Sequence, residues 1–368
     1  MRLVLLLINL LCSIPLLSQV NVSHGGFKHS PPSDPMPPGM LRYLLTENEQ
    51  IKNSRYKDSL PLHSFYISSY EESNGQYLAW LSFLKQHHED SAYIKALPDT
   101  LFWKNQNLPD SISVYLSRHY LHHPVFANYP ALGLTPEQIK RYSVWKTDRL
   151  NEMILIHEGI LEFVENDTAR DFFRTDWYLP GKSNRSERSL DSVRRIVGKS
   201  SPMFVRHSTK RNVKMEDGIL LPYYVLPTIQ EWKYAVNSGP GPRKKAAHKA
   251  VKMKRKQYDP KGYFYYLFPS ETKQTETSIH KQLRKLGIIP VQEEMNGDCL
   301  LCNIDRSVSE WVEKQTELSV LNSGIKYLRI HGPPFGNQRQ LSNLPYSYHS
   351  SESITGFRLV LPDYRGEW

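Results

Sequence analysis

The pattern of apolar and polar residues along the chain predicts short strands and amphipathic helices. The segment Leu62–Tyr70 is rich in aromatic and β-branched residues, which is typical of a strand. Directly after it, either Ser73 or Asn74 is suited to cap a helix. The apolar residues that follow recur on one helical face, and they are Tyr77, Trp80, Leu81 and Leu84. We therefore expect a strand followed by a helix with one buried face.

A second helix is predicted to begin at Thr135. Threonine is a good N-cap residue, and Pro136 suits the first helical position because it lacks an N–H group. Gln138 stands three residues after the cap, where its side chain completes a capping box. The large side chains of this predicted helix are Ile139, Tyr142, Trp145, Arg149 and Met153.

A third helix start lies in the segment Leu226–Ala235. Thr228 follows Pro227 and is a candidate N-cap, and Glu231 three residues later completes a capping box. Trp232 and the alanine three residues after it then lie on one face. The segment predicts a capped helix that carries Trp232 into the core.

Composition adds that the protein is globular and rich in loops. The chain has 368 residues, which is enough for one large domain or two ordinary ones. Its 25 proline and 19 glycine residues favour loops over a helical bundle. Two segments, residues 165–215 and 239–290, are predicted to be insertions.

The adjacent histidines at 87–88 and 122–123 point in different directions, so surface or capping roles are expected for them.

The N-terminus has the features of an export signal. A short basic start and an apolar run end near Ser18, and the run is shorter than the ~20 apolar residues of a spanning helix. Residues 1–18 are predicted to be a signal peptide and residues 19–58 a flexible leader. Cys12 offers the alternative of a lipid anchor, but the residues before it lack the small side chain of a lipobox. We expect a protein of the periplasm or the outer-membrane surface, without a later transmembrane segment.

Positive charge is concentrated in one segment, residues 243–256. The formal net charge is +10, and without the eight basic residues of this segment it is +2. Nucleic acid is not the expected partner, because an exported protein rarely meets it. An anionic envelope surface or an acidic partner protein fits the charge, and a solvated insertion without a partner stays open. The eight residues are Arg243, Lys244, Lys245, Lys249, Lys252, Lys254, Arg255 and Lys256.

Separated motifs resemble, in the same order, those of the formylglycine-generating (sulfatase-modifying-factor) domain family. The segment Leu226–Ala235 is similar to the family's Leu-Pro-Thr-x-x-Glu-Trp-x-x-Ala motif, and Phe65–Tyr77 to its opening strand and helix. Asn303–Val312 resembles its Asn-Met-x-Gly-Asn-Val-x-Glu-Trp-Val motif, and Ile354–Val360 its terminal Ile-Gly-Phe-Arg strand. The positions that carry the resemblance are Asn74, Tyr77, Trp145, Pro227, Thr228, Glu231, Trp232, Trp311, Gly356, Phe357 and Arg358.

The resemblance implies one domain over residues 59–365, with the two insertions inside it. Its fold would be the α+β, C-type-lectin-like fold of formylglycine-generating enzymes, which contains little regular secondary structure. The motifs around Trp145–Glu152 look most like those of exported proteins related to gliding-motility and type IX secretion lipoproteins of Bacteroidetes-type bacteria.

The catalytic members of this family bind copper through two cysteines near the C-terminus, and this chain has no cysteine after Cys302. The copper mechanism therefore does not carry over. Cys299 and Cys302 are consistent with a local disulfide, half of a metal site or two buried thiols. The family also binds calcium near its Asn-x-x-Glu-Trp motif. Here Ser307 replaces the asparagine and Arg306 adds positive charge, so Glu310 is expected to be a hydrogen-bonded structural carboxylate instead of a calcium ligand.

These observations predict a non-catalytic, exported protein that is a structural or binding component of the cell envelope, in gliding or type IX secretion. No cofactor is expected. One alternative is a metal-dependent oxidoreductase of the formylglycine-generating type with a diverged site. Another is a lectin-like module that binds glycans or peptides.

Overall fold

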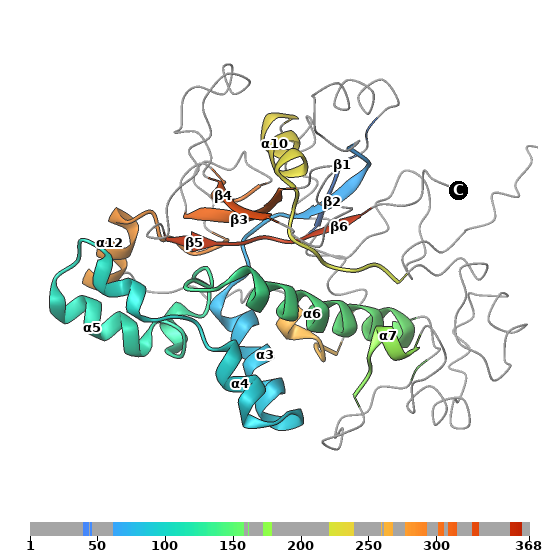
Figure 1. Ribbon diagram of the computed structural model, residues 1–368, viewed down its shortest axis with the longest axis horizontal. Coiled ribbons are helices and arrows are strands. Elements are labelled where there is room, and N and C mark those ends of the chain that lie inside the picture. Colours follow the sequence, from blue (N-terminus) through green and yellow to red (C-terminus); the bar gives the residue numbers. More distant parts are fainter. Residues whose placement is uncertain are drawn as a thin grey trace, which may run out of the picture.

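The chain folds as a mixture of helices and small sheets. The computed structural model describes residues 40–43, 45, 62–157, 161, 172–178, 221–238, 259, 261–267, 277–292, 301–304, 308–314, 326–330 and 354–362. Figure 1 shows the strands in a middle layer, with helix α10 on one side and the longer helices on the other. The predicted α+β class is confirmed.

The first sheet has the strand order β1-β2-β6, with β1 at Met40–Tyr43, β2 at Phe65–Ser68 and β6 at Val360–Pro362. Both pairs are antiparallel. Strand β1 lies inside the predicted flexible leader, so that prediction is wrong for residues 40–43. The physical reason is that β2 offers backbone groups on its free edge, and pairing there buries the side chains at both ends of β1.

The second sheet has the order β4-β3-β5, and it contains β3 at Ser309–Lys314, β4 at Lys326–Ile330 and β5 at Thr355–Gly356. Strand β3 is antiparallel to β4 and parallel to β5. Three residues, 357–359, connect β5 to β6 and so run from one sheet to the other. All three are 0% exposed, which places Arg358 in the interior between the two sheets.

Helix α3 spans Asn74–His87 and begins with a capping box. Of the two candidate caps, Ser73 is the one used: its hydroxyl accepts from the Gln76 N–H, and the Gln76 side chain accepts from the Ser73 N–H. The predicted apolar face is confirmed, since its four large residues are all buried. Gln76 also donates to the carbonyl of Leu267 at 3.0 Å, which ties the helix start to a distant segment.

Helix α6 spans Pro136–His157 and begins with the predicted capping box. The Thr135 N–H donates to Gln138 at 2.8 Å, and the Gln138 N–H donates to the Thr135 hydroxyl at 3.3 Å. The middle of α6 is buried on every side, so it buries polar as well as apolar residues. The buried polar and charged residues of α6 are Ser143, Lys146, Thr147, Asp148, Arg149, Asn151 and Glu152.

Short helices complete the described parts of the fold. They are α4 (Asp90–Ala96), η1 (Leu101–Asn105), α5 (Asp110–His119), η2 (Pro124–Phe126), α7 (Thr175–Tyr178), α10 (Ile229–Ser238), η4 (Tyr265–Leu267) and α12 (Ser278–Lys285). Three of them, α7, η4 and α12, belong to the segments predicted as insertions. In the first, Phe173 and Tyr178 are buried in a cluster with Leu155 of α6, and in the second Leu283 of α12 is buried in a core cluster. Both segments therefore contribute to the core where the structure describes them.

Candidate functional site

The point where the two sheets meet contains a fully buried ion pair between Arg358 and Glu310. Both carboxylate oxygens of Glu310 accept from Arg358, at 2.7 to 2.9 Å. The guanidinium also donates to the carbonyl oxygens of Ser68 at 3.1 Å and Cys302 at 3.2 Å. Burial alone would lower the pKa of Arg358, but the adjacent Glu310 raises it above its ordinary value.

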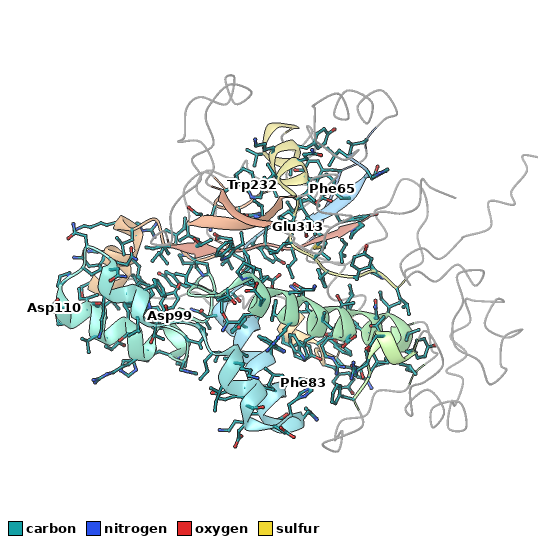
Figure 2. The ribbon with its side chains drawn as sticks, in the orientation of Figure 1. Phe65, Phe83, Asp99, Asp110, Trp232 and Glu313 are labelled. Atoms are coloured by element: carbon teal, nitrogen blue, oxygen red, sulfur yellow. The ribbon has the colours of Figure 1, made fainter. Side chains whose placement is uncertain are left out.

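Trp232 of α10 completes this ion-pair site. Its indole Nε1–H donates to Glu310 Oε2 at 2.8 Å, and its ring is 1% exposed. Figure 2 shows Trp232 at the end of α10 that lies over β3, the strand that carries Glu310. The sequence predicted only that the helix carries Trp232 into the core. The structure adds a specific hydrogen-bond acceptor for its indole, the Glu310 carboxylate.

A second buried charge cluster lies on α6. Lys146 forms an ion pair with Glu72 Oε1, and Tyr142 donates its hydroxyl to Glu72 Oε2 at 2.6 Å. The Lys146 ammonium also lies 4.9 Å from the centre of the Tyr224 ring, in a cation–π contact. Burial lowers the pKa of Lys146, and Glu72 opposes that effect. Burial, reinforced by Glu72, raises the pKa of Tyr142 well above its usual value.

The sequence did not predict this second cluster. Tyr142 and Lys146 are four residues apart, so they lie on one face of a helix, and this spacing is a signal that the sequence carries. Glu72 lies 74 positions before Lys146, and no local pattern connects the two. Only the packing of the segment after β2 against α6 brings the carboxylate to the ammonium.

The remaining motif positions have structural contacts. Asn74 donates to the carbonyls of Tyr120 and Phe126, both at 3.1 Å, and Tyr77 donates to the carbonyl of Ala96 at 2.7 Å. A Cβ at Gly356 would lie 3.0 Å from the side chain of Val308, so this glycine allows a close approach. Three more positions contribute aromatic rings to the core cluster that contains the apolar face of α3, and they are Trp145, Trp311 and Phe357.

The calcium hypothesis does not fit Glu310. Its carboxylate already accepts hydrogen bonds from Arg358 and Trp232, and a guanidinium in contact repels a second cation. Ser307 lies outside the described residues, as does Cys299, while Cys302 is buried. Within the described ranges, no group of three or more His, Cys, Asp or Glu side chains is arranged to hold a metal ion.

The predicted partner surface at residues 243–256 also lies outside the described part of the chain. Of the histidine pairs, His88 is the C-cap residue of α3, and His123 accepts from the Val125 N–H as the N-cap of η2. The His123 side chain therefore has the predicted capping role, whereas His88 contributes its backbone N–H to the end of α3. No helix among the residues that the structure describes is both long and apolar enough to cross a membrane.

Glu231 is a carboxyl group at a motif position with a strongly raised pKa. It completes the α10 capping box: the Thr228 N–H donates to Glu231 Oε2 at 2.7 Å, and the Glu231 N–H donates to the Thr228 hydroxyl at 3.1 Å. Burial raises the pKa of Glu231 to about 7, with a smaller contribution from Glu313, although the hydrogen bonds of Thr228 act in the opposite direction.

Glu231→Gln is expected to remove a pH dependence of stability. Because the pKa of Glu231 is about 7 in the folded chain and its ordinary value is 4.5, the native state binds more protons between these limits. The contribution of Glu231 to the free energy of unfolding therefore falls as pH rises from 4.5 to 7. Glutamine also completes a capping box but does not ionise. In urea titrations we expect equal stability of the variant and the wild type at about pH 5, and a gain of up to about 3 kcal/mol for Glu231→Gln at about pH 8.

The control is Glu137→Gln, which changes an exposed glutamate in the first turn of α6. It is expected to show the pH profile of the wild type. If Glu231→Gln also follows the wild-type profile, another group is responsible for the pH dependence.

Comparison of the chain with models of known protein families, with curated protein sequences and with solved structures finds no match in any of the three.

Proposed function

We propose that the protein is an exported, non-catalytic protein with the fold of the formylglycine-generating enzymes. It acts as a structural or binding component of the cell envelope, in gliding or type IX secretion. The observation that carries this proposal is the meeting of four resembling motifs at one buried ion pair. Arg358 and Glu310 come from two of them, and Trp232 comes from a third. The opening strand supplies the carbonyl of Ser68.

These motifs contribute to stability in this proposal, and not to a reaction. Each oxygen of the Glu310 carboxylate accepts at least one hydrogen bond from within the chain, and the Arg358 guanidinium donates to the carboxylate and to two carbonyls. Buried groups that meet one another's hydrogen-bonding capacity in this way fix the relative positions of segments that are distant in the sequence. The copper-binding thiols of the catalytic members have no counterpart in the sequence after Cys302. The α+β architecture with short strands is consistent with the proposed fold.

The experiment that tests the proposal is cosedimentation of the purified chain with cell envelopes. Replacing all eight basic residues of 243–256 by glutamine is expected to lower the bound fraction at least about tenfold, because each basic residue near an anionic surface contributes about 1 kcal/mol. The wild-type binding is expected to weaken as salt rises, since exposed charges are screened.

A matched control removes eight exposed positive charges from the described helices and their ends instead. The control substitutes glutamine at Lys85, Lys95, Lys104, Arg118, Lys140, Arg141, Lys281 and Lys285. It is expected to bind like the wild type, and equal losses in both variants would contradict a local surface at 243–256. The same preparation is analysed for metals, and stoichiometric copper or iron would overturn the non-catalytic assignment in favour of the oxidoreductase.

A further inference from the structure

The C-terminal end of α3 contacts the segment 172–178 through aromatic rings. Phe172 lies against three rings of α3 and its C-cap: Phe83 at 5.0 Å, His87 at 5.6 Å and His88 at 5.3 Å between ring centres. Figure 2 shows Phe83 on the side of α3 that faces α6 and α7. Two of these three ring contacts are thus made by imidazoles, which titrate near neutral pH.

The same segment is held to α6 by side chains that lie close together along that helix. Arg149 donates to the carbonyl of Phe173 at 2.6 Å, and the Thr175 N–H donates to Asp148 at 2.8 Å. Asn151 donates to the Thr175 hydroxyl at 3.1 Å. These polar contacts, together with the buried ring of Phe173, set the basal stability of the docked segment.

Two arginines lie close enough to the imidazoles to act on their charge. The Arg149 guanidinium lies 5.2 Å from the centre of the Phe83 ring, and Arg174 is on the docked segment itself. The acidic groups of the packed elements have other partners: Glu152 pairs with Arg149 at 2.9 Å and Asp176 with Arg174 at 2.7 Å, while Asp148 accepts from the backbone. Three further charged residues of the described chain lie at this end of α3 and are exposed, and they are Lys85, Glu89 and Asp90.

His87 is poorly placed to carry a proton on both nitrogens. Its Nδ1 is buried and has no hydrogen-bond partner among the residues that the structure describes, so a protonated ring would bury a charged N–H group that none of them accepts from. Burial, then Arg149 and then His88 lower the pKa of His87 below its ordinary value. Burial and Arg174 lower the pKa of His88 in the same direction. Both rings are therefore neutral in the docked state at neutral pH.

We propose that His87 and His88 form an acid-sensitive latch, in which the neutral rings hold residues 172–178 against α3 and α6 and their protonation favours detachment of the segment. Detachment removes Phe172 from both rings and exposes the half-buried ring of His87 to water, so both rings titrate near the ordinary value of 6.5. Docking is therefore strongest above pH 6.5, and it weakens as pH falls from 6.5 toward the lower pKa values of the docked state.

The test is amide hydrogen exchange of residues 172–178 in the full chain at about pH 7.5 and about pH 5.5, corrected for the intrinsic pH dependence of exchange. We expect the opening population of the wild type to rise about tenfold at the lower pH. Each histidine that must lose its proton on docking weakens docking about tenfold for every pH unit below its pKa in the detached state. The informative amide is that of Thr175, which donates to Asp148 of α6 when the segment is docked, whereas the Tyr178 N–H donates to Arg174 within the segment itself.

The double variant His87→Phe with His88→Phe keeps aromatic rings at the contact and cannot be protonated. It is expected to show the same opening at both pH values, and an acid response equal to that of the wild type would overturn the latch. A second variant, His87→Gln with His88→Gln, is expected to open more at neutral pH but still without an acid response. The control His119→Gln with His122→Gln removes exposed histidines elsewhere and should respond like the wild type.

Acid unfolding of the whole chain is distinguished by the exchange of α6 and α5. If their amides lose protection in parallel with residues 172–178 at the lower pH, the response is global and the latch is refuted. A wild type without any acid response refutes it as well.

Discussion

Replacing Arg358 by methionine is expected to lower the free energy of unfolding by about 3–5 kcal/mol, because it leaves the buried carboxylate of Glu310 without a counter-charge. Glu310 is 2% exposed. In the variant, Trp232 is the hydrogen-bond donor that the described residues still offer to its carboxylate. The carbonyls of Ser68 and Cys302 lose their guanidinium donors at the same time. Chemical denaturation followed by tryptophan fluorescence measures the loss.

The double variant Glu310→Gln with Arg358→Met separates the ion pair from simple packing. It removes both charges, while the glutamine oxygen still accepts from Trp232, so we expect it to be more stable than Arg358→Met alone. Arg141→Met is the matched control, because Arg141 is exposed on α6, and it should leave stability nearly unchanged. If the double variant loses as much free energy of unfolding as Glu310→Gln and Arg358→Met lose separately when added together, the two side chains are not coupled.

Replacing Lys146 by methionine is expected to have a comparable effect, also about 3–5 kcal/mol. The side chains of Lys146 and Glu72 are 4% and 1% exposed. In the variant, the buried Glu72 carboxylate would still accept from the Tyr142 hydroxyl but would lose its counter-charge. The cation–π contact with Tyr224 is lost in the same variant. Thermal and urea unfolding measure the loss, and circular dichroism shows whether α6 stays formed.

Lys140→Met is the control on the same helix, because Lys140 is exposed and lies less than two turns before Lys146. The double variant Glu72→Gln with Lys146→Met should recover much of the stability, since neither charge then remains buried. If Lys146→Met alone is as stable as the control, the ion pair makes no net contribution to the free energy of unfolding.

The helices were predictable from the sequence because their signals are local. The capping boxes at Ser73, Thr135 and Thr228 each involve residues three positions apart, and all three form as hydrogen-bonded pairs. The apolar face of α3 follows from a helical period in the same way. In these segments the backbone and side chains make their decisive contacts within one turn.

The buried charges were not predictable, because a charged residue in a sequence is normally expected at the surface. Glu310 was expected to be hydrogen-bonded, but its partner Arg358 is 48 positions away. Strand β1 was missed for a related reason: residues 40–43 form a strand by pairing with β2, and four residues are too few to show a clear period in the sequence. Residues 172–178 and α12 also become core segments only through distant contacts.

Local signals in the sequence were therefore enough to place the capped helices and to identify the apolar residues of α3 that face the core, whereas the α+β class was expected from the resemblance of separated motifs. The folded chain was needed to show which charged groups are buried together, which flanking segments join the sheets and the core, and which histidines contact Phe172. The physical reason is the range of the interactions. Capping and helical periodicity act between neighbours in sequence, whereas an ion pair or a strand pair is favourable only after the chain has closed the long loop between its members.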